Sequence, residues 1–418
     1  MQLRRVVVTG IGAITPLGND VSSYFHSLRN GIGGANLISR FDTEKFKVKF
    51  ACEVKNFSAD NFFDRKESKR MDLFTQFALV AADEAIINSG LMHCKGFDLD
   101  RIGVIWGTGI GGLTSFFQES VDFANGDGTP RFSPFFIPKI IVDIAPGLIS
   151  IKYGFRGPNF STVSACASST NAIIDAFNLI RLGKADAIVT GGSEAAVTEP
   201  SLGGFGNMKA LSERNDDFKT ASRPFDLDRD GFVVGEGGAC LILEDLEFAV
   251  SRGAKIYAEI VGSGLTSDAY HITAPHPEGL GARNVMQRAL QEANLKPADI
   301  DYINVHGTST PLGDIAEAKA IVSVFGEDAY KLNISSTKSM TGHLLGGAGA
   351  VESLACVMAV HEDIIPPTIN HFTDDPEFDS RLNFTFNVAQ KKTVRAALCN
   401  TFGFGGHNAT VIFKKYEA

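Results

Sequence analysis

One of the six cysteines, Cys166, lies in surroundings that suit a nucleophile. Small residues flank it and leave room for a ligand, as in the run Thr162-Val163-Ser164-Ala165-Cys166-Ala167-Ser168-Ser169-Thr170. A helix that begins here would aim unpaired N–H groups at the thiol, favouring the thiolate and stabilising the oxyanion of an attacked thioester. Burial among apolar side chains acts against the thiolate, so these two effects leave the pKa of the thiol open. The other cysteines are expected to be buried, structural thiols: Cys52, Cys94, Cys240, Cys356 and Cys399.

Two histidines are placed where they could act with such a thiol. His306 follows a predicted buried strand and begins the segment His306-Gly307-Thr308-Ser309-Thr310. The ends of strands are where α/β proteins display active groups, although His306 taken alone is typical of a hydrogen-bonded loop. His343 follows Lys338 by five positions in a run of otherwise small residues, and Glu352 comes nine positions after His343. We expect Glu352 on the same helix as His343, where its carboxylate could neutralise Lys338.

The elements that must position these residues occur twice in the same order. Strand, strand, helix and strand are predicted over residues 5–9, 101–106, 171–182 and 186–190, with a similar series over residues 256–261, 301–305, 335–360 and 396–400. Strands that alternate with helices indicate an α/β protein, here with two similar halves, residues 1–255 and 256–418. In this repeat Cys166 corresponds to His343, and both are expected at the start of a core helix. Two such helices packed across a pseudo-twofold axis would bring the two side chains together.

Bulk properties exclude several classes of function. The 418 residues carry a net charge of −9, which disfavours nucleic acid as a partner. The N-terminal residues lack the apolar region of a signal peptide, and no apolar run reaches the roughly 18 residues of a membrane span. The cysteines include no C-x-x-C pair, which fits free thiols in a reducing compartment. We therefore expect a cytoplasmic protein that binds no metal.

The familiar cofactor and nucleophile motifs are absent or out of place. Gly107-x-Gly109-x-x-Gly112 formally matches the dinucleotide fingerprint and follows a strand. The helix after it leads into Gly126-Asp127-Gly128-Thr129-Pro130, however, and not into a second strand that ends in an acidic residue. The chain contains no P-loop, no H-E-x-x-H and no G-x-S-x-G sequence. A nucleotide cofactor, a metalloenzyme and a serine hydrolase are not expected.

Four segments together resemble the β-ketoacyl-[acyl-carrier-protein] synthases. They are Ser164-Ala165-Cys166-Ala167-Ser168, the segment that begins at His306, residues 336–346, and Asn400-Thr401-Phe402-Gly403-Phe404-Gly405-Gly406-His407-Asn408. The similarity extends from residue 4 to residue 415 and is greatest to the synthase II enzymes of bacterial fatty acid elongation. It implies a duplicated thiolase fold with a layered α-β-α-β-α core. It also implies a decarboxylating condensation of a carrier-bound acyl chain with malonyl-[acyl-carrier-protein]. The enzyme would have no cofactor of its own, because 4′-phosphopantetheine arrives on the carrier protein.

The resemblance implies a role for each site residue. Cys166 would accept the acyl chain, while His306 and His343 would donate hydrogen bonds to the malonyl thioester carbonyl as it becomes an enolate. Lys338 and Glu352 would form a charge pair that orients His343. Further positions would form the oxyanion hole and gate (Phe404), bind the pantetheine arm (Thr308, Thr310), contact substrate (Thr273, Phe402) and line the acyl tunnel (Ile110).

Partner surfaces follow from the same resemblance. An isolated basic run is usually a solvated helix face, but in this family the matching cations dock the acidic acyl carrier protein: Lys66, Lys69, Arg70 and Lys209. Lys209 stands where the family has Arg, so it keeps the charge and loses the bidentate geometry. The stretch Phe132-Ser133-Pro134-Phe135-Phe136 would line the acyl tunnel, together with Ile110, near the interface of a homodimer.

Three other functions share this fold. A thiolase needs a second catalytic cysteine in the last glycine-rich loop, which here reads Phe404-Gly405-Gly406-His407-Asn408. A polyketide ketosynthase usually has different residues before its cysteine than Val163-Ser164-Ala165. A chain-length-factor subunit keeps the fold and lacks the nucleophile, whereas Cys166 is present here. The last two functions remain as alternatives.

Overall fold

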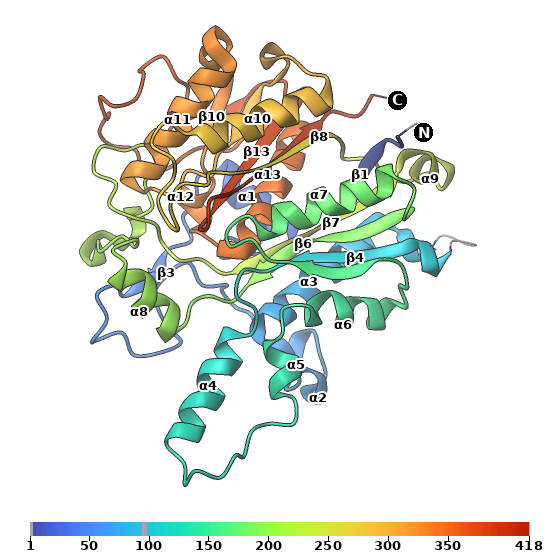
Figure 1. Ribbon diagram of the computed structural model, residues 1–418, viewed down its shortest axis with the longest axis vertical. Helices are drawn as coiled ribbons and strands as arrows, with labels where there is room; N and C mark the ends of the chain where they lie inside the picture. The colour runs from blue at the N-terminus through green and yellow to red at the C-terminus, as the bar shows by residue number, and fades with distance from the viewer. Residues whose placement is uncertain (1–2, 94–97, 418) are drawn as a thin grey trace.

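The computed structural model describes residues 3–93 and 98–417, and a mixed β-sheet runs through its centre (Figure 1). The strands of its first half are β1 (Val6–Ile14), β4 (Ile102–Gly107), β5 (Asn159–Thr162), β6 (Ala187–Glu194) and β7 (Gly237–Asp245). Those of its second half are β8 (Ala258–Ser267), β9 (Tyr302–Asn304), β10 (Asn333–Ser335), β13 (Ala396–Gly403) and β14 (His407–Lys414). Two short pairs lie outside the sheet, β2 (Asn36–Leu37) with β3 (Phe50–Ala51) and β11 (Ile364–Ile365) with β12 (Gln390–Lys391).

The strand order confirms the internal repeat. Counted outward from a central pair, the sheet reads β1, β7, β6, β4, β5 on one side and β8, β14, β13, β9, β10 on the other. Each step has the same parallel or antiparallel pairing on both sides. The central strands β1 and β8 are antiparallel, with Val7 opposite Glu259, as a twofold axis between them requires. The chain passes from one half to the other between α9 (Leu246–Ser251) and β8. The predicted division at residue 255 falls in that segment and stays a prediction.

Helices cover both faces of each half-sheet, which gives the layered α-β-α-β-α core expected for this fold. The central layer consists of α7 (Ser168–Arg181) and α13 (Ala348–Glu362), which pack against each other and against strands of both halves. The outer layers are α3 (Leu73–Ser89) with α6 (Ile144–Tyr153) and α10 (Leu280–Ala293) with α11 (Pro311–Phe325). Because α13 has buried side chains on all its faces, it lacks the polar stripe of a surface helix.

The predicted helical part of residues 335–360 is broken. The chain forms α12 (Lys338–Thr341), a turn, and only then α13. Gly342 adopts a φ of 68°, which a right-handed helix cannot contain. The prediction that His343 starts a core helix that also carries Glu352 is therefore wrong, since His343 lies in the turn and Glu352 on α13. Gly342 ends α12, and Gly346 and Gly347 lie between His343 and the start of α13.

The remaining helices lie around this core. They are α1 (Val21–Arg29), α2 (Arg65–Ser68), α4 (Leu113–Ala124), α5 (Phe136–Ile140) and α8 (Glu199–Asn207). Helices α4 and α5, with the loop between them, project from the body at the lower end of Figure 1. In the described part of the chain, no helix has the length and apolar character needed to cross a membrane.

Candidate active site

A cavity of about 530 Å³ lies between the two halves and contains most of the predicted site residues. Those that line it are Ile110, Cys166, Lys209, Thr273, His306, Thr308, Thr310, His343, Phe402 and Phe404. They come from the segments that follow β4, β8, β9 and α8, from the end of β13, and from the turns that precede α7 and α13. The duplication thus brings residues from distant parts of the chain to one place.

Cys166 lies two residues before the start of α7, as the flanking residues predicted. The preceding Ala165 has a φ of 51°, a left-handed conformation that costs free energy for a residue with a side chain. The hydroxyl of Ser168 holds this turn by donating to the carbonyl of Ala165 (2.6 Å) and accepting from the N–H of Ser164 (2.9 Å). The thiol is thereby presented to the cavity, with Sγ 3.1 Å from Nε2 of His343.

Burial decides the protonation state of this thiol. It raises the pKa of Cys166 to about 12, although the charge of Lys338 and the N–H of Phe404 act to lower it. Near neutral pH Cys166 is therefore a neutral thiol that must give its proton to a base as it attacks. Nε2 of His343 is in position to accept that proton.

Both histidines are neutral in this environment. The pKa of His306 and that of His343 are lowered well below the usual value, first by burial and then by the positive charge of Lys338. The two rings meet edge to face with their centroids 5.3 Å apart. Phe402 packs beside His306 (5.7 Å) and Phe232 beside His343 (5.3 Å). A neutral imidazole has one donor and one acceptor, so each ring can either take a proton or donate a hydrogen bond.

The structure brings Lys338 and Glu352 into a buried ion pair, in which each side chain is 2% exposed. Nζ of Lys338 donates to Oε1 of Glu352. Burial raises the pKa of the Glu352 carboxyl to about 7, against the opposing effect of the lysine. The ammonium lowers the pKa of His343 and of Cys166 from nearby. The predicted role of the pair in orienting His343 stays a prediction.

Glu317, which the sequence analysis did not single out, holds the backbone of His306. This buried side chain of α11 accepts the N–H of His306 (2.9 Å), the N–H of Gly307 (2.8 Å) and the side-chain amide of Asn400 (3.2 Å). Burial raises the pKa of its carboxyl to about 7. The available signal was weak: an acidic residue between the alanines 316 and 318, in a stretch that also carries Asp314 and Lys319.

The turn with Thr308 and Thr310 is covered by a segment of the first half of the chain. The two hydroxyls are 2.9 Å apart, and Ser309 between them adopts a φ of 69°. The N–H of Arg223 donates to the hydroxyl of Ser309 (3.1 Å), and the N–H of Gly231 donates to its carbonyl (3.0 Å). The turn that carries the predicted pantetheine-binding hydroxyls is thus held through Ser309 by the first half of the chain.

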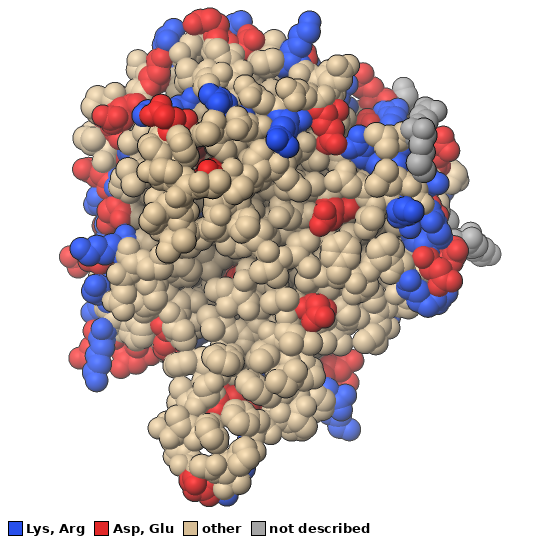
Figure 2. Space-filling model, in the orientation of Figure 1, with Lys and Arg blue, Asp and Glu red and all other residues tan. Residues whose placement is uncertain are grey.

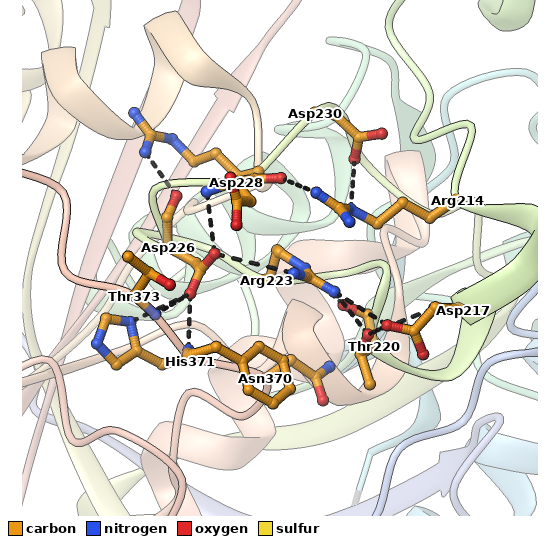
Figure 3. A network of polar contacts seen from close by, with 12 residues as sticks. Arg214, Asp217, Thr220, Arg223, Asp226, Asp228, Asp230, Asn370, His371 and Thr373 are labelled. Carbon is orange, nitrogen blue, oxygen red and sulfur yellow. Dashed lines mark hydrogen bonds and ion pairs between the residues drawn. The ribbon is translucent and has the colours of Figure 1, made fainter.

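A polar network fastens that covering segment, and the sequence analysis missed it (Figure 3). The carboxylate of Asp226 accepts the N–H groups of Phe372 (2.7 Å) and Thr373 (2.9 Å), with Arg223 close beside it. Arg229 donates to the carboxylate of Asp375 (2.5 Å). The signal for this network was the dense alternation of basic and acidic residues in positions 223–231.

The predicted docking cations form two separate groups. Lys66 on α2, with Lys69 and Arg70 directly after this helix, are exposed and lie away from the cavity. The guanidinium of Arg70 packs over the ring of Phe135, 4.9 Å from its centroid, so it also contacts the α4–α5 projection. Lys209 lines the cavity itself and is exposed.

The structure separates the two predicted parts of the acyl tunnel. Ile110 lines the cavity, whereas the stretch Phe132–Phe136 does not line it in this single chain. Phe132 stacks on Phe136 (5.1 Å) and on Phe123 of α4 (5.3 Å), which builds an aromatic cluster on the projection. A tunnel formed by both parts would need this cluster to come from another copy of the chain.

The other cysteines agree with the structural role expected for them. Cys52, Cys240, Cys356 and Cys399 are buried, and Cys94 lies outside the described residues. Cys166 is the cysteine that lines the cavity. The expectation that no cofactor is bound stays a prediction.

Comparison with known proteins places the chain in a family. The model of the β-ketoacyl synthase N-terminal domain matches residues 3–249, and that of the C-terminal domain matches residues 257–372. A Synechocystis 3-oxoacyl-[acyl-carrier-protein] synthase 2 is 51% identical, with 100% of this chain and 99% of the relative covered. The ishigamide ketosynthase/chain length factor is a similar solved structure, with a TM-score of 0.89, 35% identity, and 99% and 100% coverage. A type II polyketide ketosynthase, solved in complex with its acyl-carrier protein, has a TM-score of 0.88, 31% identity and full coverage of both chains. The chain belongs to the β-ketoacyl synthase family.

Proposed function

We propose that this β-ketoacyl synthase condenses a carrier-bound acyl chain with malonyl-[acyl-carrier-protein], releasing CO2 and free carrier and leaving a 3-oxoacyl chain two carbons longer. The observation that carries the proposal is the contact of Cys166 Sγ with His343 Nε2 at 3.1 Å, beside His306 in one buried cavity. The name of the Synechocystis relative describes the same reaction, and the match extends over the whole chain. This relative favours fatty acid elongation over the polyketide and chain-length-factor alternatives.

The first step loads the enzyme. His343 accepts the proton of the Cys166 thiol while Sγ attacks the acyl thioester carbonyl, and the carrier thiol leaves with that proton. The negative oxygen formed in the attack is stabilised by the backbone N–H groups of Cys166 and Phe404. Neutral histidine and neutral thiol avoid the cost of two buried charges before the substrate arrives.

The second step forms the nucleophile by decarboxylation. His306 and His343 donate hydrogen bonds from uncharged rings to the thioester carbonyl of the malonyl group. These bonds strengthen as CO2 leaves and negative charge moves onto that oxygen, so they favour the transition state over the bound substrate. The carbanion then attacks the acyl group on Cys166 and the carbon–sulfur bond breaks. The released sulfur takes up a proton from solvent, which restores the neutral thiol. The ion pair of Lys338 and Glu352 supports this step by positioning His343 and adding positive charge nearby.

The carrier protein supplies the reacting groups through its pantetheine arm. Thr308 and Thr310 bind the arm with their paired hydroxyls, Thr273 and Phe402 contact it or the acyl chain, and Phe404 acts as the gate. The exposed cations of α2 and the separate Lys209 at the cavity attract the acidic carrier from two sides. The solved ketosynthase–carrier complex of similar fold supports such an encounter.

A second copy of this chain completes the enzyme. β5 ends the sheet, and its neighbourhood exposes Phe160 (38%) and Val163 (56%). The face toward the viewer in Figure 2 has few charged side chains from the α4–α5 projection up across β4 and β6. Antiparallel pairing of two β5 strands would bury this face and bring the Phe132 cluster of one copy toward the cavity of the other. A cytoplasmic location remains the expectation from the sequence.

Cys166→Ala tests the mechanism directly. The variant should form no acyl-enzyme with acyl-[acyl-carrier-protein] and should not elongate it, measured by intact-protein mass and product mass over a series of chain lengths. Light scattering on the same sample measures whether the protein is a dimer. Elongation by the variant would contradict the assignment of Cys166, and failure of the unaltered enzyme with every chain would contradict the function.

A further inference from the structure

Glu194 is a buried carboxylate that none of the roles above uses. It ends β6 and is 1% exposed. Its two oxygens accept five hydrogen bonds, from Thr108 Oγ1 (3.0 Å) and from the N–H groups of Gly109 (2.6 Å), Ile110 (3.2 Å), Gly111 (3.3 Å) and Gly346 (3.0 Å). Such a set of donors needs a carboxylate, because a side-chain amide would turn donor hydrogens toward some of them.

These hydrogen bonds join two segments that form the cavity. One is the turn after β4, from which Ile110 lines the cavity; the other is the turn between His343 and α13, from which Leu345 lines it. Gly346, the donor of the second segment, follows His343 by three positions. Glu194 therefore connects the wall of the acyl pocket with the turn of a proposed catalytic residue.

The two segments approach too closely for side chains. A Cβ on Gly346 would lie 2.0 Å from the backbone nitrogen of Gly109 and 2.6 Å from Oε2 of Glu194. A Cβ on Gly109 would lie 2.9 Å from the same carboxylate oxygen. The spacing of the two turns is thus set by backbone-to-backbone contact around one buried anion.

We propose that Glu194 is a positioning residue that holds the Ile110 wall and the His343 turn in one arrangement, and so sets both the acyl-chain length accepted and the geometry of decarboxylation. The proposal rests on the function proposed above. The N–H groups of Gly109 and Gly346 share one oxygen, Oε2. If an amide nitrogen takes the place of Oε2, both N–H groups lose their acceptor together, so the Ile110 wall moves and His343 moves relative to Cys166.

Glu194→Gln tests this role, with Glu84→Gln as a matched control. Glu84 also accepts two backbone N–H groups, from Ala13 (2.8 Å) and Val21 (2.9 Å), but neither it nor those residues line the active-site cavity. Acyl transfer to Cys166 is measured by mass with short- to long-chain acyl-[acyl-carrier-protein], and decarboxylation of malonyl-[acyl-carrier-protein] is measured separately. Glu194→Gln should change the ratio of long-chain to short-chain acylation rates about tenfold and slow decarboxylation about tenfold, whereas Glu84→Gln should change neither beyond about twofold.

A third readout separates positioning from general loss of stability. Glu194 is one of the charges that raise the pKa of Cys166. Its neutral variant should alkylate faster with iodoacetamide at a given pH below that pKa, with the pH profile shifted to lower values. A merely unstable variant would show an unshifted profile and an equal loss of rate for every chain length, and that result would overturn the proposal.

Gly346→Ala is the second variant, needed if Glu194→Gln does not fold. Its added methyl group forces the Gly109 backbone and the Glu194 carboxylate away from residue 346, while the charge of Glu194 is kept. The same change in chain-length ratio is expected, and an unchanged ratio in a folded Gly346→Ala enzyme would count against the proposal. Failure of the proposed function would look different, because the unaltered enzyme would then form no 3-oxoacyl product.

Discussion

The turn after β4 and the turn after β9 occupy equivalent places in the two halves of the molecule. Val104 of β4 lies opposite the first residue of β5, and Tyr302 of β9 lies opposite the first residue of β10. Four residues further along, Thr108 in one half therefore corresponds to His306 in the other. Each turn is held by a buried glutamate that accepts consecutive backbone N–H groups, Glu194 in the first half and Glu317 in the second.

The two glutamates come from different elements. Glu194 ends a strand of its sheet and also holds the turn before α13, while Glu317 comes from helix α11 and also accepts from Asn400. The side chains on display differ as well, since the first turn presents Ile110 to the cavity and the second presents His306. Carboxylates from non-equivalent elements thus fix the two turns in a similar way, while the side chains that the turns present to the cavity differ in the roles proposed for them, chain selection and chemistry.

Removing the imidazole of His306 should have the largest effect on the reaction rate. His306→Ala should slow decarboxylation of malonyl-[acyl-carrier-protein] by about 10²–10³-fold, because one donor to the enolate oxygen is lost. Acylation of Cys166 should change only a few-fold, since His343 lies 3.1 Å from the thiol. CO2 release and acyl-enzyme mass measure the two steps. An equal loss in both would contradict the division of roles between the histidines.

Substituting Ile110, which the turn after β4 presents to the cavity, should have a smaller effect that depends on acyl-chain length. Ile110→Phe should slow acylation by long chains about 10²-fold while short chains react almost normally, because the added ring fills the pocket. The equivalent position of the second half is Thr308, and Thr308→Val should slow all chain lengths alike through loss of a hydrogen bond to the arm. Acylation rates over the same series of acyl chains measure both effects. A chain-length effect in Thr308→Val would contradict the difference in role between Ile110 and Thr308.

Replacing Glu317 should show that its role differs from that of Glu194. Glu317→Gln should lower the decarboxylation rate about tenfold, because the backbone of His306 is less well held, and should leave the chain-length ratio unchanged. Glu194→Gln is expected to change that ratio. Glu84→Gln again serves as the control. The comparison fails if Glu317→Gln alters chain-length preference as strongly as Glu194→Gln does.

The smallest effect concerns stability and pH. Burial raises the pKa of Glu317 from 4.5 to about 7, so its proton is bound more tightly in the folded state. The stabilisation from that proton is complete below the unfolded pKa of 4.5 and is lost as the pH rises through about 7. The unaltered enzyme should therefore lose about 3 kcal/mol relative to Glu317→Gln between these pH values. Urea unfolding at several pH values measures the difference, and a gap that stays constant with pH would refute this assignment.

The sequence allowed the order of elements to be predicted because buried parallel strands appear as short apolar runs bounded by glycine. It also singled out the cysteine and both histidines by their flanks of small and hydroxyl residues, and the structure places all three on one cavity; their catalytic roles stay a prediction. The prediction that a core helix starts at His343 was wrong, because Gly342 adopts a positive φ and the chain turns there before α13 begins. Glu194 and Glu317 were missed because their partners are backbone N–H groups, and a sequence does not reveal which turns return to a given side chain. A charged residue at the end of the apolar run of β6 was the only signal for Glu194.

The packing of α7 against α13 has a consequence for how such an enzyme can be divided. The proposed nucleophile, Cys166, belongs to the first half of the chain, and both histidines belong to the second. A chain cut in the segment between α9 and β8 would leave two pieces, neither of which holds a complete set of reacting groups. Catalysis thus depends on the contact between the two halves. Substitutions deep in the interface of α7 with α13 can therefore abolish activity without changing any residue that contacts the substrate.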